Sequence, residues 1–144
     1  KKKKKIILRN PNATRPWQHV LEPLSGYLIL GDKLMNRKLK SKIIPSWNFG
    51  PLKKNCKKVR FIVDLLIKEW GTSNQKIQFK KNKNFHESKL LSLNIEKAKR
   101  ELLWLPKLTL GETIKFTIDW YKYFFLNKKS EDITNHQIDY YTDK

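Results

Sequence analysis

The sequence has little of several residue types that mark common protein classes. Its one cysteine, Cys56, excludes an internal disulfide, and the Cys and His residues lack the spacing of a zinc site. No run of about 18 apolar residues is present, so no membrane-spanning helix is predicted. The first lysines precede only three apolar residues, Ile6 to Leu8, which is too few for a signal peptide. We therefore expect a cytoplasmic protein without a membrane partner.

Methionine is almost absent as well. Met35 is the one methionine and the first residue is a lysine, whereas a natural full-length chain normally begins with Met. We therefore expect a partial or truncated reading frame. The 144 residues, 39% hydrophobic and 12% aromatic, still suffice for one domain with a buried core.

Acidic residues are also scarce. The sequence has 13 Asp and Glu against 32 Lys and Arg, a formal net charge of +19, so a polyanion partner must be considered. Proteins that read nucleic acid rely on arginine for bidentate base contacts and gather their charge on one face. Here lysine dominates and is spread along the chain. We interpret much of the charge as nucleotide bias of the source genome, and expect no specific nucleic-acid partner.

Hydrophobic patterning predicts an α/β protein with short strands. Strands are expected at 6–9, 17–20, 47–51 and 77–79, with loops at 38–45 and 52–58. Helical spacing predicts helices over 21–37 and 59–70, the second ended by Gly71. Asn94 is placed to cap a further helix, which buries Ile95, Ala98 and Leu102.

Two capping boxes are predicted in the last third of the chain, Thr109 with Glu112 and Thr134 with Gln137. The first begins a long helix, whose expected buried face is Leu110, Ile114, Thr117, Ile118, Tyr121 and Phe125. Aromatic residues on its other sides indicate a second surface that a missing part of the molecule could cover. The second box, with Ile133 and Ile138 as a hydrophobic staple, begins a short helix over about 135–141. We divide the chain into a main portion, 1–126, and a tail, 127–144.

The segment from Arg9 to Leu28 carries most of the functional information. Asn10-Pro11-Asn12 is typical of a turn, and Arg15 then precedes the predicted start of a helix. A helix N-terminus offers free N–H groups, and an arginine beside it can bind two phosphate oxygens at once. The segment therefore indicates a diphosphate site, although an arginine near a strand end is often only a solvated surface residue.

The same residues carry a family resemblance. Asn-Pro-Asn-Ala-Thr-Arg-Pro-Trp-Gln-His-Val-Leu-Glu-Pro-Leu-Ser-Gly-Tyr, at 10–27, resembles the signature of CDP-glucose 4,6-dehydratases, which are extended short-chain dehydrogenase/reductases that act on nucleotide sugars. Two further blocks agree in order: Ser46-Trp47-Asn48-Phe49-Gly50-Pro51, and His86-Glu87 followed by the segment 96–106. The resemblance covers nearly the whole chain but only the C-terminal part of the family.

The resemblance implies a fold and a division of labour. The chain is identified as the C-terminal, substrate-binding portion of such an enzyme, without its Rossmann half. The sequence has no Gly-x-Gly-x-x-Gly, and its one Tyr-x-x-x-Lys, Tyr140 to Lys144, is a coincidence at the C-terminus. NAD is therefore expected to bind the missing N-terminal half, the complete enzyme is expected to be homo-oligomeric, and this chain alone is expected to bind no NAD and catalyse no dehydration.

Five residues are candidates for binding the CDP-sugar substrate: Arg15, Asn48, His19, His86 and Lys89. The resemblance places Arg15 at the nucleotide diphosphate and Asn48 near ribose and phosphate, while Lys89 would add positive charge. Asn48 could instead satisfy a turn, and His19 could be a bonded structural histidine. His86 and Glu87 match a His-Glu pair of the family, but neighbours in a strand point to opposite faces, which argues against joint catalysis.

The third block departs from the family pattern. Leu103 stands where the family usually has glycine, and Leu90 and Asn94 stand where tyrosine and aspartate are common. Two alternatives to the dehydratase portion therefore stay open. One is a small basic protein that binds nucleic acid or another polyanion, and the other is a remnant without function.

Overall fold

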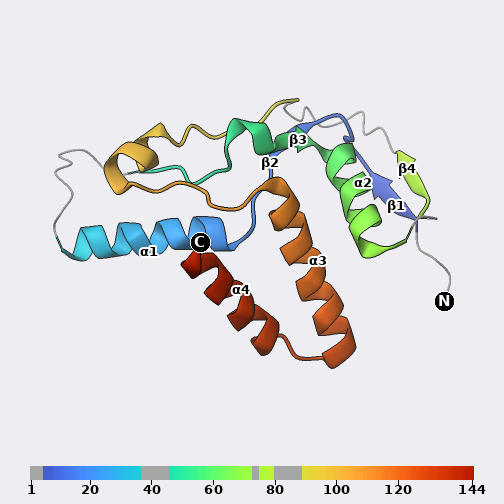
Figure 1. The fold of residues 1–144 in the computed structure, drawn as a ribbon. Coiled ribbons are helices and arrows are strands. Elements are labelled where there is room, and N and C mark those ends of the chain that lie inside the picture. The colour runs from blue at the N-terminus through green and yellow to red at the C-terminus, as the bar shows by residue number, and fades with distance from the viewer. Residues whose placement is uncertain (1–4, 37–45, 73–74, 80–88) are drawn as a thin grey trace.

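The computed structural model describes residues 5–36, 46–72, 75–79 and 89–144. Four main helices and four short strands surround two apolar clusters: β1 Ile6–Leu8, β2 Thr14–Pro16, α1 Leu21–Met35, β3 Cys56–Lys58, α2 Val59–Trp70, β4 Ile77–Phe79, α3 Leu110–Asn127 and α4 Glu131–Asp143. In Figure 1, α1 lies at one side, α2 lies with β1 and β4 at the other, and α3 and α4 form a hairpin between and below them. The chain is α/β, as the sequence predicts.

The strands form two separate pairs. β1 and β4 form a parallel pair, with Ile6 opposite Ile77. β2 and β3 form an antiparallel pair, with Arg15 opposite Lys57. The strands predicted at 6–9 and 77–79 are confirmed. The strand predicted at 17–20 is wrong. The pairing stops at Pro16, and the side chains of Trp17 and Gln18 then donate to the carbonyl oxygens of Lys57 and Phe49 in place of a backbone ladder.

The segment 46–58 also differs from the prediction. Residues 47–51 form no strand, because this extended segment lies against the core through Phe49, and the Phe49 carbonyl accepts from the Gln18 side chain. The loop expected at 52–58 contains a 3-10 turn, Lys53–Asn55, followed by β3. The loop predicted at 38–45 lies outside the described residues.

The predictions for α1 and α2 are confirmed within two residues. α2 ends at Gly71, whose φ of 84° is the left-handed conformation that glycine adopts without strain. Ile62 of α2 packs against Ile114 and Ile118 of α3, with half-buried residues around them.

The second cluster lies between α1 and the segment 93–104. Its buried residues are Phe49, Ile95, Ala98, Leu102 and Trp104. The Asn94 side chain accepts from the Glu96 N–H, as a capping residue does, and the turn that follows is a π-helix, Ala98–Leu102. The predicted burial of Ile95, Ala98 and Leu102 is confirmed. Burying a side chain such as Leu102 stabilises the fold by roughly 1.5–3 kcal/mol.

The capping box of α3 is confirmed, with both the Thr109 and the Glu112 side chains bonded to backbone N–H groups. The predicted buried face is wrong at its C-terminal end, since Tyr121 and Phe125 are 47% and 55% exposed. They lie beside the C-terminal end of α2, where the Phe125 ring meets the Trp70 ring edge-on (6.1 Å between centroids), and about half of each side chain stays exposed.

The second surface of α3 is covered by the chain itself. Trp120 donates to the Thr134 hydroxyl (3.0 Å), and the Gln137 amide donates to the Phe116 carbonyl (2.9 Å), so α4 lies on this side of α3. The expectation that a missing part covers it is therefore wrong for these residues. The second capping box and its staple are also wrong: α4 begins at Glu131 after the N-cap Ser130, and Thr134 donates to the Ser130 carbonyl inside the helix.

Candidate functional site

Arg15 lies on β2, six residues before Leu21, the first residue of α1. Its side chain is half-buried, and its guanidinium donates to the Thr14 carbonyl (2.9 Å). Lys57 stands opposite it in the register with β3. The strand therefore places two positive residues beside each other, just ahead of a helix start.

Lys89 approaches the same strand from a distant part of the sequence. The Thr14 N–H donates to the Lys89 carbonyl (2.9 Å), and the Leu91 N–H donates to the Thr14 carbonyl (3.1 Å). The bridge is between Thr14 and Leu90, so Lys89 lies one residue before it and Arg15 one residue after it, and Lys89 is exposed. His86, another of the five candidates, and its neighbour Glu87 lie outside the described residues.

Asn48 is exposed and joins two segments. Its side-chain amide donates to the Asn94 carbonyl (3.3 Å), and the neighbouring Phe49 carbonyl accepts from Gln18. Asn48 is thus connected through Phe49 to the residue that precedes His19. These bonds match the structural role of a loop asparagine, and its contact with substrate stays a prediction.

His19 is buried at the start of α1. Its Nδ1 accepts from the Leu21 N–H (3.4 Å), and its ring lies edge-on to Phe116 with 5.5 Å between centroids. Burial lowers the pKa of His19, so the ring is neutral near pH 7. The histidine therefore holds the helix start, and a contact with phosphate stays a prediction.

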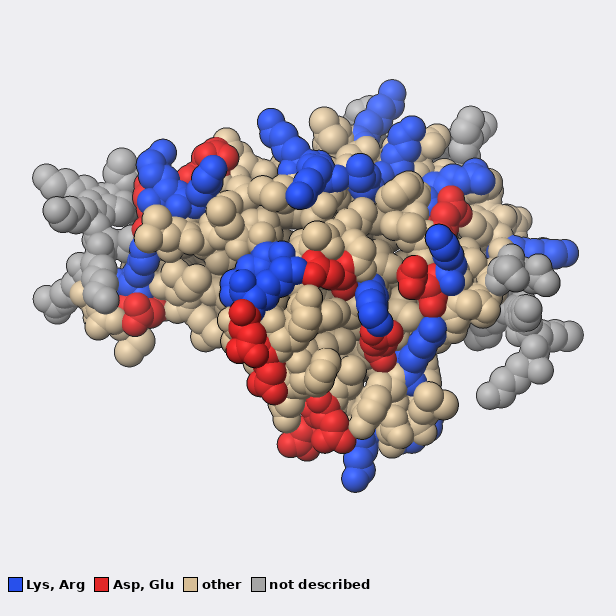
Figure 2. All heavy atoms as spheres, in the orientation of Figure 1, with Lys and Arg blue, Asp and Glu red and all other residues tan. Residues whose placement is uncertain are grey.

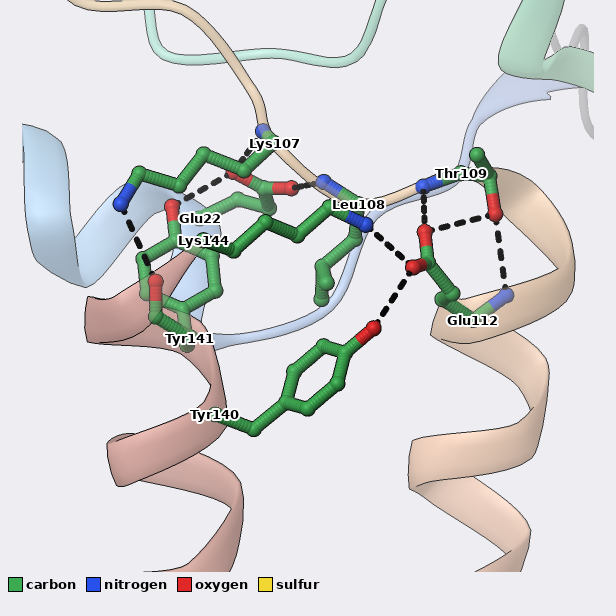
Figure 3. Close-up of polar contacts among 8 residues, drawn as sticks. All are labelled: Glu22, Lys107, Leu108, Thr109, Glu112, Tyr140, Tyr141 and Lys144. Carbon is green, nitrogen blue, oxygen red and sulfur yellow. Dashed lines mark hydrogen bonds and ion pairs between the residues drawn. The ribbon is translucent and has the colours of Figure 1, made fainter.

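Sequence reasoning missed a network centred on Glu22, in the first turn of α1 (Figure 3). Its carboxylate is 1% exposed and accepts from the N–H of Leu108 (2.6 Å), the N–H of Lys107 (3.1 Å) and the hydroxyl of Tyr141 (2.7 Å). Burial, together with the bond to this carboxylate, raises the pKa of Tyr141 and keeps its hydroxyl protonated. A glutamate in a first helical turn is ordinary, so no sequence signal marks Glu22 as buried.

A second carboxylate lies beside this network at the start of α3. Glu112 accepts from Thr109, from the Tyr140 hydroxyl (3.1 Å) and from the Lys144 ammonium group. The bond with Lys144, followed by the backbone bond from Thr109, lowers the pKa of Glu112 to about 2. The last residues of α4 are therefore tied to α1 through Glu22 and to α3 through Glu112.

Two cavities adjoin these elements. One of about 290 Å³ lies between the start of α1 and the α3–α4 hairpin, and its lining includes Gln18, His19 and Trp120. The Gln18 side-chain oxygen is buried without a hydrogen-bond partner. The other, of about 560 Å³, is mainly apolar and lies among β1, α2 and α3.

Charge is spread over the surface. On the face drawn in Figure 2, Lys and Arg are most numerous along the upper edge, while Asp and Glu form a row over α4 and are otherwise scattered among the basic side chains. Within the described part of the chain, no helix is long and apolar enough to cross a membrane. The same residues include no group of three His, Cys, Asp or Glu side chains that could hold a metal ion.

Comparison with known proteins connects this arrangement to one group of enzymes. No family model matches the chain. CDP-glucose 4,6-dehydratase of Salmonella typhimurium is 40% identical over 117 residues, which are 81% of this chain and 32% of the relative. The chain resembles a C-terminal part of CDP-glucose 4,6-dehydratase. The resemblance inferred from residues 10–27 is thereby confirmed, and the chain spans about a third of the length of this dehydratase.

Solved structures agree with the similarity to CDP-glucose 4,6-dehydratase. The dTDP-glucose 4,6-dehydratase of Bacillus anthracis, solved with NAD, has a TM-score of 0.64 and 25% identity over 83% of this chain and 34% of its own. The UDP-glucose 4-epimerase of Bifidobacterium longum, solved with NAD⁺ and UDP, has a TM-score of 0.67 and 16% identity. The match covers 83% of this chain and 35% of the epimerase. The fold is that of the C-terminal portion of extended short-chain dehydratases and epimerases.

Proposed function

We propose that the chain is the nucleotide-sugar-binding C-terminal portion of a CDP-glucose 4,6-dehydratase-like enzyme, which converts CDP-glucose to CDP-4-keto-6-deoxyglucose. The observation that carries the proposal is the placement of the segment 10–27. In this segment, Arg15 stands on β2 opposite Lys57, six residues before the start of α1, and the Lys89 carbonyl accepts from the preceding residue, Thr14. The 40% identity to the Salmonella dehydratase supports the assignment to this substrate class.

The chemistry of the site fits a diphosphate. The Arg15 guanidinium can donate two parallel N–H groups to phosphate oxygens, and Lys89 can add a second positive charge. Asn48 is the candidate for a ribose or phosphate contact. The described residues bind and orient the substrate, and we assign no proton transfer to them.

NAD supplies the hydride acceptor and donor of the complete reaction. The residues of this chain do not fit its binding, because the sequence has no glycine-rich turn between a strand and a helix. We therefore assign NAD binding to a Rossmann portion that the 144 residues do not contain. The NAD-bound dehydratase of Bacillus anthracis, about three times as long as the match, supports this division.

The exposed β1–β4 sheet also supports the proposal that a Rossmann portion completes the molecule. Parallel sheets are usually buried on both faces, and a sheet of two short strands is not stable on its own. Ile7 of β1 and Phe79 of β4 are 57% and 48% exposed, and within the described residues neither strand has a second neighbour. A Rossmann portion would add strands at the edges of this sheet, and its helices would cover the exposed faces.

Titration calorimetry with CDP and CDP-glucose tests the proposal. The chain should bind both nucleotides and should bind glucose alone undetectably, because the diphosphate and the base supply the recognition. Arg15→Ala should weaken the binding of both nucleotides. Arg60→Ala is its control, because it removes one positive charge from an exposed arginine of α2 that pairs with Asp64. A folded chain that binds neither nucleotide would contradict the proposal and favour a remnant without function.

A polyanion-binding protein is the second candidate, because the net charge is +19 and basic side chains line one edge in Figure 2. Tight, sequence-selective binding of DNA or RNA at physiological salt would favour it. Charge alone does not require the residues at 10–27, which is why we rank it second.

A further inference from the structure

We propose that α4 positions the nucleotide-sugar-binding segment 15–19, and that Tyr141 does so through the buried carboxylate of Glu22. The inference rests on the proposed function, because it concerns the segment assigned to the diphosphate. Tyr141 is a positioning residue here, since within the described part of the chain it bonds Glu22, Ser25 and Lys107 and no candidate binding residue.

Three parts of the chain converge on Glu22 (Figure 3). The residue itself belongs to α1, the two N–H donors belong to Lys107 and Leu108 ahead of α3, and the hydroxyl donor belongs to α4. A carboxylate that is 1% exposed is stable only while its oxygens are hydrogen-bonded. Removing one donor therefore favours a displacement of the first turn of α1 toward other donors or water.

The first turn of α1 is bonded in turn to the binding segment. The Glu22 N–H donates to the His19 carbonyl (3.1 Å), and the Leu21 N–H donates to His19 Nδ1 (3.4 Å). Gln18, the residue before His19, donates to the Phe49 carbonyl. A displacement of Glu22 is thus transmitted to 18–19, which follow Arg15 by three and four residues.

The position of α4 depends on the same tyrosine. The Tyr141 hydroxyl lies 2.9 Å from Ser25 Oγ, which accepts from the Trp104 indole, and the Lys107 ammonium group donates to the Tyr141 carbonyl (3.0 Å). Tyr140 on the same helix bonds the less buried Glu112 of α3 instead. The two adjacent tyrosines therefore contact two carboxylates, and the Tyr141 contact is the one that leads to α1.

Tyr141→Phe tests the inference, with Tyr140→Phe as its matched control. Each change removes one hydroxyl that donates to a carboxylate and keeps the ring, and Tyr141→Phe also removes the contact with Ser25 Oγ. Hydrogen–deuterium exchange should be about tenfold faster over 15–24 in Tyr141→Phe, because a bond to a buried charged acceptor is lost. CDP should bind about tenfold more weakly to this variant, while Tyr140→Phe should stay within about twofold of the wild type in both measurements.

The two readouts separate this inference from the proposed function. If the wild-type chain binds no CDP, the proposed function fails, and the exchange comparison still decides whether Tyr141 holds the segment. If Tyr141→Phe melts at a lower temperature but leaves the exchange over 15–24 unchanged, the tyrosine only stabilises the fold and the inference is wrong. Should Tyr141→Phe not fold, Lys107→Met removes the ammonium group that donates to the Tyr141 carbonyl and lies over the Tyr141 ring, while the Lys107 N–H stays bonded to Glu22. Unchanged exchange over 15–24 in that variant would equally overturn the inference.

Discussion

Arg15 is the residue on which the proposed substrate contact depends. In an enzyme completed with a Rossmann portion, Arg15→Ala should raise KM for CDP-glucose and weaken binding by on the order of 2 to 4 kcal/mol, because a charged bidentate contact is lost. Arg15→Lys should recover only part of the loss, since an ammonium group cannot bind two oxygens as a planar fork does. Steady-state kinetics with both variants measure this. Kinetic constants unchanged in Arg15→Ala would remove Arg15 from the site.

Glu112 gives a prediction about acid stability. Its pKa is lowered from 4.5 to about 2 in the folded chain, so its stabilising effect is fully present above about pH 4.5 and is lost as the pH falls toward 2. Glu112→Gln should therefore lower the free energy of unfolding at pH 7 by about 1 kcal/mol, since solvent screens this ion pair, and should lower it less at pH 3. Urea unfolding at the two pH values measures the difference. Glu131→Gln, at an exposed carboxyl of α4, serves as control, and an equal loss at both pH values would contradict the account.

The sequence indicated some residue roles and missed others for physical reasons. The capping box of Thr109 and Glu112 depends on four adjacent residues and was predictable. The burial of Glu22 depends on Lys107, Leu108 and Tyr141, which are more than eighty residues away. Local patterns carry no information about such distant donors, so the sequence could not mark Glu22 as a buried hub.

At the scale of the elements, α1 offers a paired test of packing. A Cβ on Gly26 would overlap the Phe49 ring, whereas a Cβ on Gly31 would meet no atom within 4 Å. Gly26→Ala should therefore destabilise the fold by about 1–3 kcal/mol through overpacking. Gly31→Ala should stabilise it by about 0.5–1 kcal/mol, because alanine is the better helix former. Thermal melts of the two variants would contradict this packing of α1 on Phe49 if both changed stability in the same direction.

Helices were predictable from the sequence where one apolar stripe faced one partner. α2 shows this, since its stripe and its terminal Gly71 defined both ends of the helix. The strand predicted at 17–20 was wrong because side-chain bonds from Trp17 and Gln18 replace the ladder there. The C-terminal end of α3 was mispredicted because helical spacing extends to Tyr121 and Phe125, where α2 ends at Trp70 and leaves about half of each side chain exposed.

At the scale of the whole molecule, the net charge of +19 leads to a salt prediction. If the lysines reflect genome bias, DNA binding rests on counterion release and should fall by about 10³-fold or more between 50 and 200 mM salt. Fluorescence anisotropy with two unrelated DNA duplexes measures both the salt dependence and the preference. A strong preference for one duplex that persists at 200 mM salt would favour the polyanion candidate over the dehydratase portion.

We propose that this chain supplies substrate binding while a Rossmann portion supplies NAD binding and chemistry. The most direct measurement joins the 144 residues to the N-terminal portion of the Salmonella CDP-glucose 4,6-dehydratase and follows formation of the 4-keto product from CDP-glucose and NAD. We expect product from the joined protein and none from the isolated chain, which lacks the glycine-rich turn. Product from the isolated chain, or a folded, NAD-bound joined protein without turnover, would contradict it.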